Sequence, residues 1–386
     1  MGRPSARARP AASRGAFFRG GSDARWVWSL TDDEASRAGG YGGRVQVRRD
    51  ARLADLTTLG VGGPVDRLVE VTTRDELVAA VRDADDTGRP LLVLGGGSNV
   101  IGSDGGWSGD VVLVRTRGVT PTGRDGEVEV EAGEPWDDLV AHTVATGLAG
   151  IEALSGIPGS TGATPVQNVG AYGQEVAQTI TAVRVYERAT RTERVLTSAD
   201  LAFAYRDSRL KRHPGAFVVL SVTFALTPQP HSLPVAYAEL ARTLGVGLGE
   251  TAPLAEVREA VLGLRRGKGM VWDPAAPDTR SAGSFFTNPI VPVGAAVPGC
   301  PSWPAGVGAD GAEQVKLSAA WLVQSAGFGK GTRDGRVGTS PRHSLALTTE
   351  PGATAAELLA FAQRVVGAVR ERFGVTLVPE PTVVGG

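Results

Sequence analysis

Ser155-Gly-Ile-Pro-Gly-Ser-Thr-Gly-Ala-Thr-Pro-Val-Gln-Asn-Val-Gly-Ala-Tyr-Gly173 is the stretch that decides the fold. It contains five glycines and two prolines but no charged side chain. Glycine permits positive φ and close backbone approach, and proline removes an N–H donor, so the segment cannot form an ordinary helix. It is too apolar for a solvated linker. We expect a buried loop whose backbone amides cradle a large polyanionic cofactor. The alternative is a glycine-rich turn packed on a sheet.

Composition narrows the class of protein. The 386 residues have room for two or three domains, and 42% hydrophobic with 21% charged residues is ordinary for a globular chain. A net charge of −1 gives no bulk attraction to nucleic acid or to an anionic membrane. The single cysteine, Cys300, excludes an internal disulfide, and the four histidines lack the spacing of a zinc motif. We expect a cytoplasmic protein that binds no metal.

Lysine is rare in this chain. Only four of the 40 Lys and Arg residues are lysines, which suggests a coding bias toward arginine. A lysine that occurs despite this bias is a candidate for a function that needs its compact ammonium group. The four are Lys211, Lys268, Lys316 and Lys330.

The N-terminal part divides into an appendage and a folded region. Residues 1–44 are rich in Arg, Ala, Pro, Ser and Gly without an apolar segment, which predicts a disordered leader or an upstream start codon rather than a secretory signal. Thr73 and Glu76 form a capping box before a helix. A buried strand, residues 91–94, then leads into the loop Gly95–Asn99. This loop matches neither a Rossmann fingerprint nor a P-loop, and it is equally compatible with a turn and a phosphate cradle.

Strands and helices alternate without a regular βαβ rhythm, which favours the α+β class. Beyond the loop we expect strands over residues 111–114, 128–132, 182–187, 192–196, 217–226, 343–348 and 375–377, and helices over 136–146, from 198, and over 253–266, 316–326 and 353–373.

Five motifs, in order, resemble one family, the UDP-N-acetylenolpyruvoylglucosamine reductases. They are Leu91–Val100, Ile157–Tyr172, Tyr205–Ser208, Ala282–Pro289 and Pro379-Glu380. The resemblance covers residues 45–384. It implies an FAD-binding domain of the vanillyl-alcohol-oxidase type over residues 45–272, in two subdomains (45–101 and 102–272) joined by the tail 379–386. It also implies an α+β substrate-binding domain over residues 273–378.

The resemblance implies reduction of UDP-N-acetylglucosamine enolpyruvate to UDP-N-acetylmuramate by NADPH through FAD, a step of peptidoglycan precursor synthesis. Arg206 would hold the substrate carboxylate, Glu380 would polarise the developing enolate, and Ser284 would protonate the α-carbon. Each has a plainer local interpretation: an ion pair of Arg206 with Asp207, a small residue in a tight strand, and a solvated turn acid. Lys268 is a hypothetical partner that would make Ser284 more acidic.

The remaining motif positions imply a cofactor site and a substrate site. The flavin would lie against Gly95, Gly96, Gly97, Ser98, Asn99, Gly159, Gln167, Asn168, Gly170, Ala171, Tyr172 and Arg265. The substrate would contact Tyr205, Lys268, Asn288 and Lys330, with Tyr237 as a lid and His343 where the family often has glutamine. The segment after Lys268 is longer than in short family members, and the spacing to Lys330 differs by one residue. We expect Lys211 and Lys316 to be solvated surface residues.

Two other functions remain open. One is a related flavin oxidase acting on a small alcohol or sugar, although no cysteine or histidine motif for covalent flavin attachment is present. The other is a sugar-nucleotide binder without catalysis, against which the presence of Arg206, Ser284 and Glu380 argues. We expect a monomer that binds neither nucleic acid nor membrane.

Overall fold

A mainly parallel sheet forms the first layer of residues 46–386, the part of the chain that the computed structural model describes. Its strands β2, β5 and β3 are parallel, and β1 pairs with β2 in the antiparallel sense. Helix α2 (Arg74–Asp86) begins at the expected Thr73–Glu76 capping box and buries Leu77 and Val81. The strand bounds are β1 Gln46–Arg48, β2 Val65–Val71, β3 Leu91–Leu94 and β5 Trp107–Val114. The leader expected over residues 1–44 lies outside the described residues.

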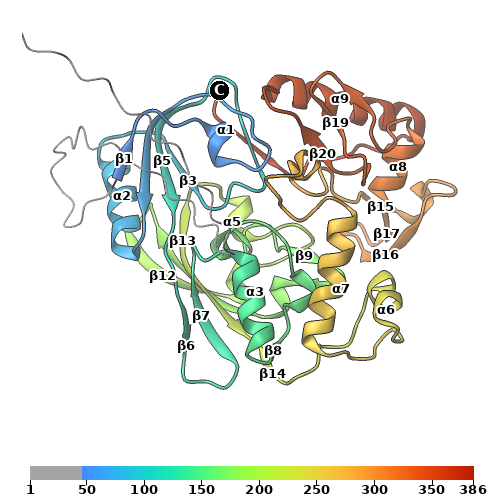
Figure 1. Cartoon of the computed structure of the whole chain (residues 1–386), viewed down its shortest axis with the longest axis horizontal. Coiled ribbons are helices and arrows are strands. Elements are labelled where there is room, and N and C mark those ends of the chain that lie inside the picture. Colours follow the sequence, from blue (N-terminus) through green and yellow to red (C-terminus); the bar gives the residue numbers. More distant parts are fainter. Residues whose placement is uncertain (1–45) are drawn as a thin grey trace, which may run out of the picture. The chain divides into compact units, whose positions relative to one another are not determined.

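A five-stranded antiparallel sheet, in the order β12-β11-β13-β7-β6, forms the second layer (Figure 1). Val69 and Val112 of the first sheet share a buried core with Tyr186 and Val218 of the second. The buried Tyr186 hydroxyl accepts a hydrogen bond from Arg82 of α2 at 3.1 Å, so its polar end is satisfied. The strand bounds are β6 Val119–Pro121, β7 Glu127–Glu131, β11 Ile180–Glu187, β12 Thr192–Thr197 and β13 Phe217–Ala225.

The uncharged stretch folds as a loop that contacts strands β7 and β13 and, at Gly156, helices α3 and α7. It contains a 3₁₀ turn, Thr161–Ala163, and strand β9 (Gly170–Ala171), which pairs with β10 (Gln174–Glu175) just after the stretch. The expected absence of an α-helix is confirmed. The helices of this region are α3 Trp136–Ala145, α4 Ser198–Leu201, α5 Arg209–Arg212, α6 Ala238–Leu244 and α7 Leu254–Gly267.

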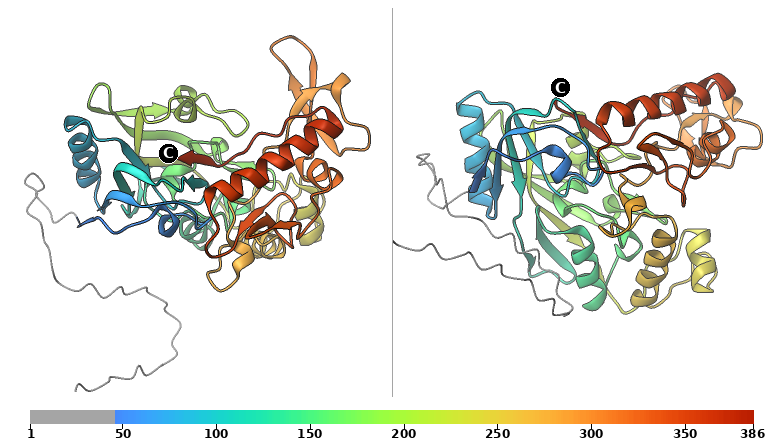
Figure 2. Two further views of the ribbon diagram at one scale, coloured as in Figure 1. Left: turned by 90° about the horizontal axis from the view of Figure 1, so that it is seen from above. Right: turned by 45° about the horizontal axis from the view of Figure 1, so that its top comes forward.

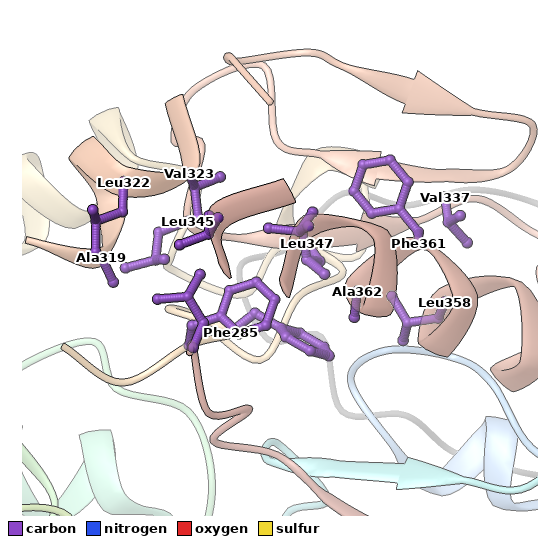
Figure 3. Packing of buried hydrophobic residues seen from close by; sticks show 14 of the residues in the cluster. Phe285, Ala319, Leu322, Val323, Val337, Leu345, Leu347, Leu358, Phe361 and Ala362 are labelled. Carbon is purple, nitrogen blue, oxygen red and sulfur yellow. The ribbon is translucent and has the colours of Figure 1, made fainter. Parts of the chain in front are cut away.

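The C-terminal part packs around two adjacent phenylalanines, in a core that also includes Leu59, Val61 and Ile101 of the N-terminal part. Phe285 and Phe286 are fully buried with ring centroids 5.1 Å apart. Figure 3 shows Phe285 among side chains from helix α8, strand β20 and helix α9. The elements are α8 Ala319–Ser325, α9 Ala355–Phe373, and strands β15 Ile290–Pro292, β16 Ser302–Val307, β17 Glu313–Leu317, β18 Arg333–Asp334, β19 Val337–Thr339 and β20 Leu347–Thr349.

The C-terminal tail returns to the first part of the chain. After α9, strand β21 (Thr382–Val384) pairs in parallel with β4 (Val100–Gly102), which directly follows the Gly95–Asn99 loop. The views in Figure 2 follow the tail from the end of α9. Just before β21, the Glu380 N–H donates to the Phe285 carbonyl at 2.8 Å. The tail therefore joins the glycine loop to the segment that carries Ser284.

Three sequence-based assignments are wrong. Lys316 lies in strand β17, paired with Ile290, because helix α8 begins only after its N-cap, Ser318. Residues 343–346 form a turn before β20, so the expected strand starts late. Residues 375–377 are not in a strand; Val375 and Leu377 are apolar because they pack into the C-terminal core.

Asp104 links helix α9 to the loop after β4. Its carboxylate accepts hydrogen bonds from the Ala355 and Ala356 N–H groups at 2.8 and 2.9 Å, at the positive end of the helix dipole. We expect Asp104→Ala to lower the free energy of unfolding by about 1 kcal/mol in urea denaturation. The control is Asp334→Ala, whose carboxylate is 60% exposed and pairs with Arg364, and which should cost less than about 0.5 kcal/mol. Equal losses in the two variants would contradict the prediction.

Candidate active site

The two glycine-rich segments pack against each other. A Cβ on Gly96 would lie 2.6 Å from the Gly159 Cα, and one on Gly95 would lie 2.0 Å from the Ser160 Oγ. Ser98 Oγ donates to the Pro158 carbonyl at 3.1 Å across the same contact. Gly97 needs its glycine for a different reason, because its φ is +62°. Close packing thus explains Gly95 and Gly96 and brings Gly95–Asn99 and Gly159 to one place.

A hydrogen-bonded chain of side chains runs from this place to Glu380. The Asn99 Nδ2 donates to Gln167 Oε1 at 2.8 Å, and the Gln167 Nε2 donates to Glu380 Oε1 at 3.1 Å. The Arg206 Nε lies 3.5 Å from the same carboxylate oxygen. Predicted site residues from distant motifs are therefore in contact.

Arg206 is held in an unusual backbone conformation. Its φ is +54°, and Asn168 and Tyr172 also have positive φ, at +47° and +49°. Non-glycine residues rarely adopt this region, and such residues cluster at functional sites. The Arg206 guanidinium donates to the carbonyls of Asn168 (3.3 Å) and Gly170 (2.6 Å), while its own carbonyl accepts from Lys211 Nζ at 2.8 Å. These bonds fix the guanidinium beside Glu380.

The plainer interpretations of the two charged residues are wrong. Asp207 pairs with Arg212, not with Arg206. The side chain of Glu380 is only 14% exposed, so it is not a solvated turn acid. Burial raises the pKa of the Glu380 carboxyl, and the positive charges of Arg206 and Lys211 oppose this shift.

Ser284 lies in an irregular segment that is joined to Glu380 by a main-chain hydrogen bond of the next residue, Phe285. Gly283 before it has a φ of +73°, and Phe285 after it accepts the main-chain hydrogen bond from Glu380. The hypothesis that Lys268 assists Ser284 is not supported, because the Lys268 Nζ forms an ion pair with Glu239 at 2.6 Å. The Lys268 Nζ also lies 5.3 Å from the centroid of the Tyr172 ring.

A cavity of about 520 Å³ collects several of the predicted substrate-binding residues. Lys268, Lys330 and His343 line it, together with Glu239 and Arg342. The predicted lid residue Tyr237 precedes helix α6 and contacts Tyr172 edge-on, with ring centroids 5.5 Å apart. The cavity walls carry the cations Lys268, Lys330 and Arg342 beside acidic side chains, and Lys268 is paired with one of these, Glu239. The proposed lid lies near the predicted flavin-binding residue Tyr172.

His343 lines the cavity as a neutral imidazole. Its Nδ1 accepts a hydrogen bond from the Leu345 N–H at 3.2 Å, which leaves Nε2 to carry the proton. Burial, with the positive charges of Lys268 and Lys330, lowers its pKa to about 4. At neutral pH the residue offers a hydrogen-bond donor without adding charge.

Two lysines expected on the surface instead contact predicted site residues. Lys316 Nζ lies 4.7 Å from the centroid of the Tyr205 ring, and Lys211 supports Arg206. The Tyr205 hydroxyl in turn accepts from the Asn288 N–H at 3.4 Å, and the Asn288 Oδ1 accepts from Ala319 at the start of α8. The rarity of lysine is the sequence signal that could have singled out both residues. Lys268 and Lys330 line the cavity, and Lys211 and Lys316 contact Arg206 and Tyr205.

The surroundings of Arg265 fit an anionic part of a flavin cofactor. Its side chain is buried on α7, where Nη2 donates to the Met270 carbonyl at 2.8 Å and Nε has no protein partner among the described residues. A buried guanidinium with a spare donor favours an anionic group at that point. The Asn168 side chain, in contrast, is used internally by Glu175, Ala177 and Ala204, so only its backbone is available to a ligand. Gly170 and Ala171 likewise present backbone, in strand β9.

Two family models match separate parts of the chain. Residues 65–195 match the FAD binding domain, and residues 273–384 match the C-terminal domain of UDP-N-acetylenolpyruvoylglucosamine reductase. With the geometry above, they define an FAD-dependent oxidoreductase and confirm the α+β fold with an FAD-binding and a C-terminal domain. The first match and the reductase relatives support FAD and NADPH as the cofactors.

Whole-chain relatives carry one name. UDP-N-acetylenolpyruvoylglucosamine reductase of Thermobifida fusca is 52% identical over 353 residues, 87% of this chain and 98% of the relative. That of Salinispora arenicola is 53% identical over 350 residues, 87% and 95% of the two chains. The crystal structure of the Thermus caldophilus reductase matches with a TM-score of 0.61 and 28% identity over 89% of this chain and 99% of that one. The chain belongs to the UDP-N-acetylenolpyruvoylglucosamine reductase family.

Between residues 46 and 386, no helix is long and apolar enough to cross a membrane. Over the same range, no three His, Cys, Asp or Glu side chains group as they would around a metal ion.

The depressed pKa of His343 predicts a pH dependence of stability. Between pH 6.5 and 4 the unfolded chain takes up a proton that the folded His343 refuses, so stability falls as the pH falls. From pH 7 to pH 4.5 this loss amounts to about 2 kcal/mol. We expect urea denaturation at the two pH values to show a loss smaller by that amount in His343→Gln. The same loss in both proteins would contradict a neutral, buried His343.

Proposed function

We propose that this protein reduces UDP-N-acetylglucosamine enolpyruvate to UDP-N-acetylmuramate with NADPH, a cytoplasmic step of peptidoglycan precursor synthesis. When bound, FAD supplies the chemistry by accepting hydride from NADPH and donating it to the enolpyruvyl double bond. The observation that carries the proposal is the contact between Arg206 and Glu380, beside the segment of Ser284.

The three residues have complementary roles in this proposal. Hydride arriving at the β-carbon places negative charge on the α-carbon and the carboxylate of the substrate. The fixed Arg206 guanidinium would bind that carboxylate, and the buried Glu380 carboxyl, with its raised pKa, would hydrogen-bond it as the charge develops. The Ser284 hydroxyl would then protonate the α-carbon.

The remainder of the substrate would occupy the neighbouring cavity. Lys268 and Lys330 would bind the diphosphate, and the neutral His343 would donate from Nε2. Tyr237 would close over the ligand from the N-terminal end of α6. Tyr205 and Asn288, already linked at 3.4 Å, would contact the part of the substrate nearest Arg206.

The organisation of the chain follows from these roles. We propose an FAD-binding domain over residues 45–272, with subdomains 45–101 and 102–272 joined by the tail 379–386, and a substrate-binding domain over residues 273–378. The pairing of β21 with β4 supports assigning the tail to the first domain. We propose that the protein acts as a monomer.

Ser284→Ala tests the mechanism. In stopped-flow absorbance without oxygen, the variant should be reduced by NADPH at the wild-type rate. Reoxidation by UDP-N-acetylglucosamine enolpyruvate should slow by at least about 10²-fold, because one preorganised proton donor is lost. The control is Thr287→Ala, three residues along the segment, whose hydroxyl donates to the Val378 carbonyl. It should reoxidise at the wild-type rate.

Two results would reject the proposal. A purified protein without flavin would remove the cofactor assignment. A wild-type protein whose reduced flavin reacts with oxygen but not with the enolpyruvyl substrate would instead be a flavin oxidase.

A further inference from the structure

The side chains of Asn99 and Gln167 form hydrogen bonds with each other and with Glu380. Asn99 Nδ2 donates to Gln167 Oε1 at 2.8 Å and also to the Glu380 main-chain carbonyl at 3.2 Å. The Asn99 carbonyl accepts from Thr382 N–H at 3.0 Å. Asn99 thus holds the tail on both sides of Pro381, at the root of β21.

In both amides the nitrogen donates to the next residue of the hydrogen-bonded chain, from Asn99 to Gln167 and from Gln167 to Glu380. An amide has one acceptor oxygen and one donor nitrogen, so donation from Asn99 holds Gln167 Oε1 on the Asn99 side. The Gln167 Nε2 is then turned to Glu380, where it donates to Oε1 at 3.1 Å. Arg206 Nε approaches the same oxygen at 3.5 Å. Among the described residues, both of these polar contacts of the Glu380 carboxyl go to Oε1.

We propose that Asn99 and Gln167 are positioning residues that turn the Glu380 carboxyl so that Oε1 is held by protein and Oε2 faces the substrate. The inference rests on the proposed function, because it concerns the group that meets the substrate carboxylate. It also changes the assignment of both residues: their side chains serve Glu380, and only their backbone serves the flavin.

The hydrogen-bonded chain Asn99–Gln167–Glu380, which we call the relay, ends at a carboxyl group whose pKa is shifted in opposite directions by its surroundings. Burial favours the protonated form, and Arg206 and Lys211 favour the ionised form; Tyr205 also faces the group. Donation from Gln167 to Oε1 is compatible with both forms, whereas a carbonyl oxygen in its place would accept only from a protonated Glu380. The amide direction therefore controls both the orientation and the proton affinity of the acid.

Asn99→Asp and Gln167→Glu test the relay with almost no change in shape. In Asn99→Asp the new carboxylate accepts rather than donates, so the Gln167 amide turns over and presents Oε1 to Glu380. In Gln167→Glu a second carboxyl faces Glu380. Both changes should raise the apparent pKa of the Glu380 carboxyl by about one unit or more. Its infrared carboxyl band, assigned with Glu380→Gln, measures this directly in the FAD-loaded protein without substrate.

Kinetics and cofactor affinity separate the relay from a flavin contact. We expect both variants to keep the wild-type rate of reduction by NADPH and an FAD dissociation constant within about threefold of wild type, by flavin fluorescence. Reoxidation by the enolpyruvyl substrate should slow by about 10- to 100-fold, with its pH profile displaced upward. The control, Gln178→Glu, adds the same charge at the last residue of the short 3₁₀ helix Val176–Gln178. It should change neither the two rates, nor the pH profile, nor the FAD affinity.

The outcomes are distinct. An unshifted Glu380 band in both variants, or an FAD affinity at least about tenfold weaker with the band unchanged, would overturn the relay. If wild-type protein is not reoxidised by the enolpyruvyl substrate, the proposed function fails, and the infrared titration still decides whether Asn99 and Gln167 control Glu380.

Discussion

The main-chain hydrogen bond from Glu380 to Phe285 joins segments that are far apart in the sequence. On one side of it, Phe285 and Phe286 are buried in the C-terminal core, so the segment carrying Ser284 cannot move freely. On the other side, the tail continues into β21 and pairs with β4, just after the glycine loop. Because both sides are anchored, the acid, the serine and the loop keep one arrangement, and the site depends on it.

The positive charge of Arg206 is balanced by the carboxyl group of Glu380, which lies beside it. The Arg206 guanidinium is restrained by two backbone carbonyls, and its left-handed backbone is restrained by Lys211, whose Nζ donates to the Arg206 carbonyl. Glu380 is buried against it, so each group lowers the cost of burying the other. The cavity differs, because Lys268 and Lys330 line it together with Glu239. There the half-buried His343 stays neutral and adds a donor without adding repulsion.

The predictions succeeded where the chemistry of a residue is local. The capping box at Thr73, the helix of residues 253–266 and the long helix of 353–373 follow from spacing along one element, and the structure has all three. They failed where the partner was remote. Lys316 was placed in a helix and on the surface, but a strand partner, Ile290, and an aromatic ring, Tyr205, decide its position. No pattern within the sequence encodes those contacts.

By itself, the sequence determined the family, the α+β class, the uncharged glycine-rich loop and the candidate residues, because these depend on residue types and their order. Only the tertiary structure decided which candidates meet. It paired Lys268 with Glu239 rather than with Ser284, turned Gln167 toward Glu380, and gathered all four lysines around the site. The reason is physical: burial and the direction of a hydrogen bond arise from packing between distant segments, which order along the chain does not specify.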